Sequence, residues 1–138
     1  MIEVITKPLI KERDIRFIKS KLRESKQVYV EDLHNRIQDI YLYKTKGKIV
    51  AFSCNKKSQL KNFDIELGYT WVDPDFRGNI YCVRLLDFQI KDIKNKNLKT
   101  YSINSKLNKV MVKYCRKNKF KIFATGINNK NLQWRIIN

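Results

Sequence analysis

The fold is decided by ELGYTWVDPDFRGNIYCVRLL, the stretch from Glu66 to Leu86. Its first part alternates along Ile65, Leu67, Tyr69 and Trp71, which is typical of a β-strand. A turn with proline and glycine follows, and then apolar residues recur at spacings of three and four, at Val83, Leu86, Ile90 and Ile93. A strand that leads through a turn into a helix leaves free backbone amides at the helix N-terminus, and these attract phosphate. The stretch therefore predicts a strand, an anion-binding turn and a helix.

The length and composition favour one folded domain over residues 1–138. The chain has 138 residues with 43% apolar and 12% aromatic content, which suits a single core. No apolar run approaches the roughly 20 residues that span a bilayer, and the N-terminus does not resemble a signal peptide, so we expect a cytoplasmic protein without a membrane partner. The three cysteines and the one histidine are scattered, which predicts neither a disulfide framework nor a metal site.

The net charge is the strongest compositional signal. Thirty basic residues against thirteen acidic ones give a charge of +17. From Lys91 to Asn138 there are thirteen Lys or Arg and one acid, Asp92, whereas the acids outnumber the bases from Asp64 to Ile90. Such a field draws polyanions, of which nucleic acid is the commonest, although a lysine-rich surface can also serve solubility alone.

The apolar periods predict alternating strands and helices along the chain. The strands are expected at Ile2–Ile5, Asp39–Tyr43, Lys48–Ser53, Phe63–Val72, Leu98–Ile103, Lys121–Ile127 and Leu132–Ile137. A first helix is expected from Lys7, with Pro8 in its first turn, to about Glu24, and a short second helix at Glu31–Arg36. A third helix follows the proline and glycine turn and runs to about Lys94, and a fourth follows a cap at Asn104 or Ser105. Lys44 to Gly47 predicts a hairpin turn, and Asn55 to Asn62 a polar loop. The order is β-α-(α)-β-β-β-α-β-α-β-β, an α/β (α+β) mixed sheet flanked by helices.

Val72 to Asn79, VDPDFRGN, resembles the acyl-CoA-binding turn of the GNAT N-acyltransferase superfamily, whose pattern is V-x-P-x-x-R-G-x-G-x-G/A. The predicted element order is similar to the GNAT fold from end to end. The resemblance implies acetyl-CoA or another acyl-CoA as the donor, with its pyrophosphate on the turn. Position by position, the implied donor-binding residues are Val72, Arg77, Gly78, Asn79 and Ile80, together with Asn108 at the start of the late helix. The chain departs from the pattern at Ile80 and Cys82, where the family has small residues, so a turn without a ligand is the alternative.

The resemblance also implies catalytic positions. Glu66 begins the central strand, where several members keep a carboxylate that deprotonates the acceptor amine, and Asp64 is the second choice. The alternative is that Glu66 is a solvated strand residue or a partner for a nearby lysine. The late-helix pattern N-x-x-A-x-x-L-Y-E-K-x-G-F aligns from Asn108 to Phe120, which places Tyr114 and Cys115 at or beside the residue that protonates the departing thiolate and Lys119 at the usual glycine. Both side chains could instead pack against the sheet.

The charge supplies an expectation about the acceptor. Late basic residues predict a phosphate-binding ridge of Lys106, Lys109, Lys113, Arg116, Lys117, Lys119 and Lys121. The leading hypothesis is a CoA-dependent N-acyltransferase for an amine on or near tRNA or DNA. The alternatives are a DNA-modification protein resembling the GNAT-like Mom type of bacteriophages, and a catalytically inactive module that binds nucleic acid or a protein partner.

Leu132 to Asn138 has a composition that would allow two sheets to pair in a homodimer.

Overall fold

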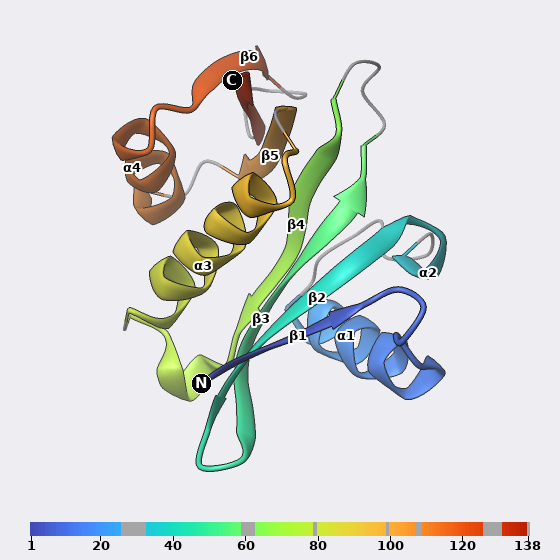
Figure 1. Ribbon diagram of the computed structural model, residues 1–138. Helices are drawn as coiled ribbons and strands as arrows, with labels where there is room; N and C mark the ends of the chain where they lie inside the picture. Colours follow the sequence, from blue (N-terminus) through green and yellow to red (C-terminus); the bar gives the residue numbers. More distant parts are fainter. Residues whose placement is uncertain are drawn as a thin grey trace.

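Seven strands and four α-helices make up the described part of the chain (Figure 1). The computed structural model describes residues 1–25, 33–58, 63–78, 80–98, 100–106, 109–125 and 131–137. The strands are β1 (Ile2–Thr6), β2 (Ile37–Thr45), β3 (Lys48–Lys57), β4 (Ile65–Val72), β5 (Thr100–Lys106), β6 (Lys121–Thr125) and β7 (Asn131–Ile137). The helices are α1 (Glu12–Glu24), α2 (Leu33–Arg36), α3 (Tyr81–Asn95) and α4 (Lys109–Lys117), with a 3₁₀ turn η1 (Pro74–Phe76) before α3. The predicted element order and the mixed α/β fold class are confirmed.

The strands form one mixed sheet in the order β1-β2-β3-β4-β5-β7-β6. The β4–β5 pair is parallel because α3 crosses over between these strands, and the other five pairs are antiparallel. β7 lies between β5 and β6, so both of its edges are paired within the chain. The expected pairing of two sheets through Leu132–Asn138 stays a prediction; within the described residues, the strand at this end of the sheet is β6.

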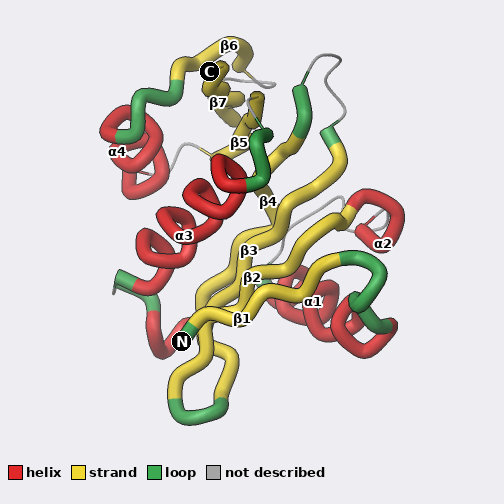
Figure 2. Tube along the Cα trace, viewed as in Figure 1, coloured by secondary structure: helices red, strands yellow, loops and turns green. Residues whose placement is uncertain are grey.

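Helices cover both faces of the sheet, with α1 and α2 on one side and α3 and α4 on the other (Figure 2). On the α1 face, Ile15, Ile18 and Leu22 pack on apolar residues of β2, β3 and β4. On the α3 face, Leu86, Ile90 and Ile93 pack on Ile65, Leu67 and the residues of β5 and α4. Helices α1 and α3 each bury an apolar stripe whose residues recur at spacings of three and four.

Three expectations about element limits are corrected. Helix α1 begins at Glu12 rather than Lys7, because the chain first turns after β1, where the Leu9 amide donates to the Thr6 carbonyl (2.8 Å). Asn55 to Lys57 continue β3 instead of forming a loop. Asn104 and Ser105 belong to β5, so neither caps α4.

The buried stripe of α3 also differs from the predicted one. Val83 is 37% exposed, whereas Leu85 and the polar Gln89 are fully buried. Gln89 is tolerated there because its side-chain amide donates to the Cys54 carbonyl (3.0 Å) and to Asn55 Oδ1 (2.8 Å). Leu86, Ile90 and Ile93 are buried as predicted, and the buried stripe also includes Leu85 and Gln89 instead of Val83.

Candidate active site

Strands β4 and β5 part in the middle of the sheet. They pair at Ile65 with Tyr101, at Glu66 with Ser102 and at Leu67 with Ile103. The pairing ends there, although β4 continues to Val72 and β5 to Lys106. Beyond Leu67 the described residues of β4 and β5 are not paired with each other. Main-chain groups that face such a gap between two strands can hydrogen-bond a ligand.

A β-bulge lies at the point where the two strands part. Phe52 pairs with Trp71 and Cys54 with Gly68, so Tyr69 and Thr70 together face one residue of β3. Tyr69 has φ of +51°, a left-handed conformation that costs a residue with a side chain about 1–2 kcal/mol. Backbone strain of this kind persists where the surrounding structure enforces it, often at a functional site.

The bulge also exchanges the two faces of β4. Ile65 and Leu67 pack on the α3 face, whereas Tyr69 and Trp71 pack on the α1 face. Strict alternation predicted that all four residues share one face, and that prediction is wrong because the extra residue shifts the alternation by one. Glu66 consequently lies on the same face as Tyr69.

Glu66 lies in a compact cluster of charged side chains on the α1 face. Its carboxylate accepts a 2.6 Å hydrogen bond from Arg36 Nη2 and lies 3.3 Å from Lys56 Nζ. The side chains of Arg36, Glu66 and Lys56 are only 18%, 16% and 11% exposed. Lys56 Nζ also lies 4.3 Å from the ring centroid of Tyr69. Burial lowers the pKa of the Lys56 ammonium, and the nearby Glu66 carboxylate partly opposes this effect.

Arg36 and Lys56 were absent from the predicted site. Lys56 could have been found, because it continues the apolar face of β3 two residues after Cys54 and four after Phe52. Arg36 carried no comparable signal in the sequence, since it comes from a four-residue helix that only the folded chain brings beside β4.

The turn after β4 has the predicted strand–turn–helix form. The Asp73 carboxylate accepts a hydrogen bond from the Asp75 amide (2.9 Å), and Arg77 Nε donates to the Val72 carbonyl (3.0 Å). Gly78 has φ of +81°, and a Cβ built there would meet nothing within 4 Å. Asn79 lies outside the described residues. The turn thus holds Arg77 close to the end of β4 and leaves the backbone at Gly78 open.

Ile80 is the N-cap residue of α3 and is 51% exposed. Its side chain therefore does not fill the core, and the first turn of α3 contains no acidic residue. Cys82, the other departure from the GNAT pattern, packs against the core on the α3 face. An open glycine, an exposed N-cap and a helix N-terminus without acidic residues in its first turn fit the phosphates of an acyl-CoA.

Tyr114 and Cys115 point in different directions from α4. Tyr114 Oη donates a 2.7 Å hydrogen bond to Asp87 of α3, and burial together with this bond raises the pKa of the phenol. Cys115 is fully buried among apolar residues, which raises the pKa of its thiol to about 12. Of the two candidates for a proton donor, Tyr114 alone directs its polar atom toward α3. Asn108 lies outside the described residues.

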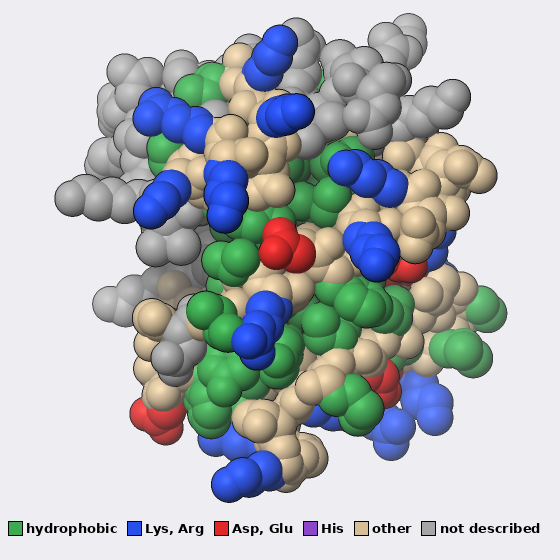
Figure 3. Space-filling model, turned by 60° about the vertical axis from the view of Figure 1, so that its left-hand side comes forward, with side chains coloured by type: hydrophobic (Ala, Val, Ile, Leu, Met, Phe, Trp, Pro, Cys, Tyr) green, Lys and Arg blue, Asp and Glu red, His purple; other side chains and the backbone are tan. Residues whose placement is uncertain are grey.

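The predicted basic ridge is exposed where its side chains are described. Lys113, Arg116, Lys117, Lys119 and Lys121 are all exposed, on α4 and at the start of β6. The side chains of Lys106 and Lys109 are outside the described part. Figure 3 shows Lys and Arg side chains over much of this face, with few acidic ones among them. The ridge is therefore solvent-accessible, as phosphate binding would require.

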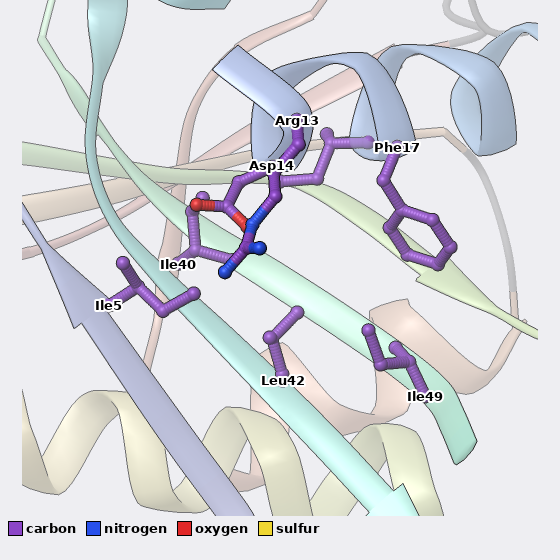
Figure 4. A pocket seen from close by; sticks show the side chains of 8 residues that line it. Ile5, Arg13, Asp14, Phe17, Ile40, Leu42 and Ile49 are labelled. Carbon is purple, nitrogen blue, oxygen red and sulfur yellow. The ribbon is translucent and has the colours of Figure 1, made fainter. Parts of the chain in front are cut away.

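A separate pocket of about 220 Å³ lies between α1 and strands β1, β2 and β3 (Figure 4). Its floor is apolar, and Arg13 and Asp14 lie on its α1 side. The pocket is lined by Ile5, Arg13, Asp14, Phe17, Ile18, Ile40, Leu42 and Ile49. None of these residues belongs to β4, β5 or the turn, so the pocket is distinct from the candidate active site.

Solved structures with this arrangement include N-acetyltransferases. The ribosomal-protein-S18-alanine N-acetyltransferase from Escherichia coli superposes with a TM-score of 0.74 at 12% identity over 99% of this chain and 94% of that one. Escherichia coli ElaA superposes with a TM-score of 0.78 at 10% sequence identity, over 99% of this chain and 98% of that one. A GNAT family acetyltransferase from Elizabethkingia anophelis with acetyl-CoA bound superposes with a TM-score of 0.70 at 16% sequence identity, over 100% of this chain and 97% of that one. The chain has the GNAT fold. The fold predicted from the turn motif and element order is thus confirmed.

The GNAT fold is recognised here through structure. No protein-family model matches the sequence, and a search of curated proteins finds no significant match. Within the described residues, no group of three or more His, Cys, Asp or Glu side chains could hold a metal ion. No helix in the described ranges is long and apolar enough to cross a membrane. The roles of the individual site residues stay predictions.

Proposed function

We propose that the protein is an acyl-CoA-dependent N-acyltransferase whose acceptor amine is on, or associated with, a nucleic acid such as tRNA or DNA. The acyltransferase activity is proposed from the bulge at Tyr69, which lies where β4 separates from β5 within a GNAT fold. The nucleic-acid acceptor is supported by the net charge of the chain, +17, which creates a positive field. A cytoplasmic location agrees with both the acyl-CoA donor and the nucleic-acid acceptor.

The proposed donor site runs from the turn to the parted strands. Arg77, Gly78 and the N-terminal amides of α3 would hold the pyrophosphate, with Val72 at the end of β4 and Asn79 and Ile80 beside them. A bound acyl-CoA would supply an activated thioester. Strand β4 is not paired with β5 beyond Leu67, so a backbone amide of β4 near Tyr69 to Val72 would donate to the carbonyl oxygen as negative charge develops there.

Two side chains would handle protons. Glu66 lies on the α1 face and assists deprotonation of the acceptor amine, directly or through water. Tyr114 lies on the α3 face and provides a proton for the leaving thiolate. Because Tyr114 already donates to Asp87, this hydrogen bond must exchange for one to the sulfur during the reaction. Cys115 is the weaker candidate for this role, since its thiol is sealed in the core.

The test of donor binding is thermal stabilisation by acetyl-CoA and by free CoA. A ligand that binds only the folded state raises the melting temperature, because it stabilises that state by an amount that grows with the logarithm of its concentration above Kd. At 100 times Kd this amount is about 2.7 kcal/mol. Arg77→Glu should reduce the shift. Arg16→Glu is the matched control, because Arg16 is also exposed but lies on α1, across the sheet from α3. The absence of a shift in the parent protein would refute donor binding.

The acceptor class has a separate test. Binding of tRNA and duplex DNA should weaken steeply with salt, and Arg116→Glu with Lys117→Glu should reduce both the affinity and the salt slope. Retention of nucleic acid without any response to CoA would instead support an inactive binding module. A clear response to acetyl-CoA without nucleic-acid binding would leave an acyltransferase with a different acceptor.

A further inference from the structure

We propose that Lys56 is itself an acyl acceptor, so that the protein acylates its own Lys56 side chain in the candidate active site. This inference rests on the proposed donor binding, and the experiment below separates the failure of one from the failure of the other. Three observations carry it: the position of the Lys56 ammonium, the groups that surround it, and its burial.

The ammonium of Lys56 lies beside the first β4 residue that has lost its β5 partner. A Cβ built on Gly68 would be 2.8 Å from Lys56 Nζ and 2.6 Å from its Cε. Gly68 directly follows Leu67, the last β4 residue that pairs with β5. The amine therefore lies against the backbone where the two strands part, next to the strained Tyr69. An acyl group held between the strands would be adjacent to it.

The groups around Lys56 form a binding site for an ammonium. The Glu66 carboxylate lies 3.3 Å from Nζ, and the Tyr69 ring centroid lies 4.3 Å from it on another side. A carboxylate and an aromatic face are the two features that recognise an ammonium group in proteins. An external acceptor amine would need the same features, so Lys56 occupies the place of a substrate.

Burial prepares Lys56 for nucleophilic attack. An amine reacts only in its neutral form, and an exposed lysine is almost entirely charged at neutral pH. The side chain of Lys56 is 11% exposed, and Arg36 brings a second positive charge to the cluster through its bond to Glu66. Burial and this second cation both favour the neutral amine.

The proposed step is balanced without a further reactant. The Lys56 ammonium first loses one proton to water, with Glu66 as the nearest carboxylate. The neutral amine then attacks the thioester carbonyl carbon, the C–N bond forms and the C–S bond breaks. The electron pair of the C–S bond leaves on sulfur, and a second proton from the nitrogen ends on that sulfur as the CoA thiol. Lys56 becomes a neutral amide and loses its charge.

The test maps acetylation by mass spectrometry after the whole protein is incubated with acetyl-CoA. Lys57 is the internal reference, because it is the next residue of β3 but is exposed and directed to the opposite face. We expect Lys56 to gain an acetyl group at least about tenfold faster than Lys57 through proximity to the bound donor. Acetyl phosphate, a donor without the CoA moiety, should label Lys57 in preference to Lys56. Lys56→Arg should lose the modification, and Lys57→Arg should keep it.

A second readout needs no acyl-CoA. Trace labelling of amines with acetic anhydride should be slower at Lys56, but unchanged at Lys57, when free CoA is present. If acetyl-CoA stabilises the protein thermally while Lys56 stays unmodified, or reacts no faster than Lys57, the inference is wrong and the proposed donor binding stands. If acetyl-CoA gives no stabilisation, both are wrong.

Discussion

Lys56 occupies the space in which any residue other than glycine at position 68 would place its Cβ. The ideal Cβ position on Gly68 is 2.6 Å from Lys56 Cε, well inside van der Waals contact. Gly68 thus lets a long cationic side chain lie flat on β4, between Glu66 and the ring of Tyr69. A small residue in one strand and a buried lysine in the next are therefore interdependent.

Gly68→Ala should destabilise the protein by about 1–2 kcal/mol, because the new methyl group displaces Lys56 from its partners. Urea unfolding followed by circular dichroism measures this change. In a Lys56→Ala background, where the space is free, the same substitution should cost less than about 0.5 kcal/mol. An equal cost in both backgrounds would show that the contact is not the cause.

The sequence was sufficient to predict the layout but not the active-site cluster. Periodic apolar residues predicted the strands and the longer helices, since each of these elements buries one face. The turn from Val72 to Asn79 predicted the strand–turn–helix unit at the candidate site. The bulge at Tyr69 was not predictable, because an inserted residue leaves the alternation of Ile65, Leu67, Tyr69 and Trp71 intact in the sequence. Its effect appears only when β4 is paired with β3.

The association of Arg36 with Glu66 could not be predicted for a related reason. The two residues are thirty positions apart and meet because α2 ends beside β4. Val83 shows the opposite error: its spacing fitted the apolar stripe of α3, but Val83 is exposed, whereas Leu85 and Gln89, which were not predicted, are buried beside Leu86 and Ile90. Packing between elements that are distant in the sequence determines such contacts and the buried face of a helix, and the local spacing of apolar residues does not specify them.

Lys119 provides a test of local backbone strain. It lies two residues after the end of α4 with φ of +65°, and the amide of Phe120 donates to the Cys115 carbonyl (2.9 Å), as in a Schellman motif. Glycine adopts this conformation without a Cβ clash, so Lys119→Gly should stabilise the protein by about 0.5–1 kcal/mol. Lys113→Gly, which removes the same charge from within α4, should destabilise it by about 1 kcal/mol. Equal effects of the two substitutions on the urea midpoint would contradict this account.

The buried thiol of Cys115 predicts a loss of stability in alkaline solution. Burial raises its pKa from an ordinary 9.0 to about 12 in the folded protein. The unfolded thiol therefore ionises first, and the stabilising contribution is complete below pH 9 and is lost progressively as the pH rises from 9 to 12. At pH 10 the loss should be about 1.4 kcal/mol.

Cys115→Ala isolates this contribution. Between pH 8 and pH 10 the unfolding free energy of the variant should fall by about 1.4 kcal/mol less than that of the parent. Val112→Ala also removes apolar atoms from α4, next to the same core, and should keep the full pH dependence of the parent. If both variants follow the parent, ionisation of Cys115 does not contribute.

Asn55 is the centre of a buried hydrogen-bond network between β2, β3 and α3. Its side-chain amide donates to Asp39 Oδ2 and to Tyr41 Oη, each at 2.9 Å, and its carbonyl oxygen accepts from Gln89 Nε2 at 2.8 Å. Asn55, Gln89 and Tyr41 are fully buried, so loss of the central group leaves several polar atoms without water or a partner.

Asn55→Leu, which conserves the approximate volume, should therefore destabilise the protein by about 3 kcal/mol. Ser53→Ala is the matched control on the same face of β3, because Ser53 is equally buried but makes one side-chain hydrogen bond, to Thr70 at 3.1 Å, and should cost about 1 kcal/mol. A double variant with Gln89→Leu should cost clearly less than the sum of the two single changes, since both remove the same bond. Additive costs in urea unfolding would show that Asn55 and Gln89 act independently and that the network is not cooperative.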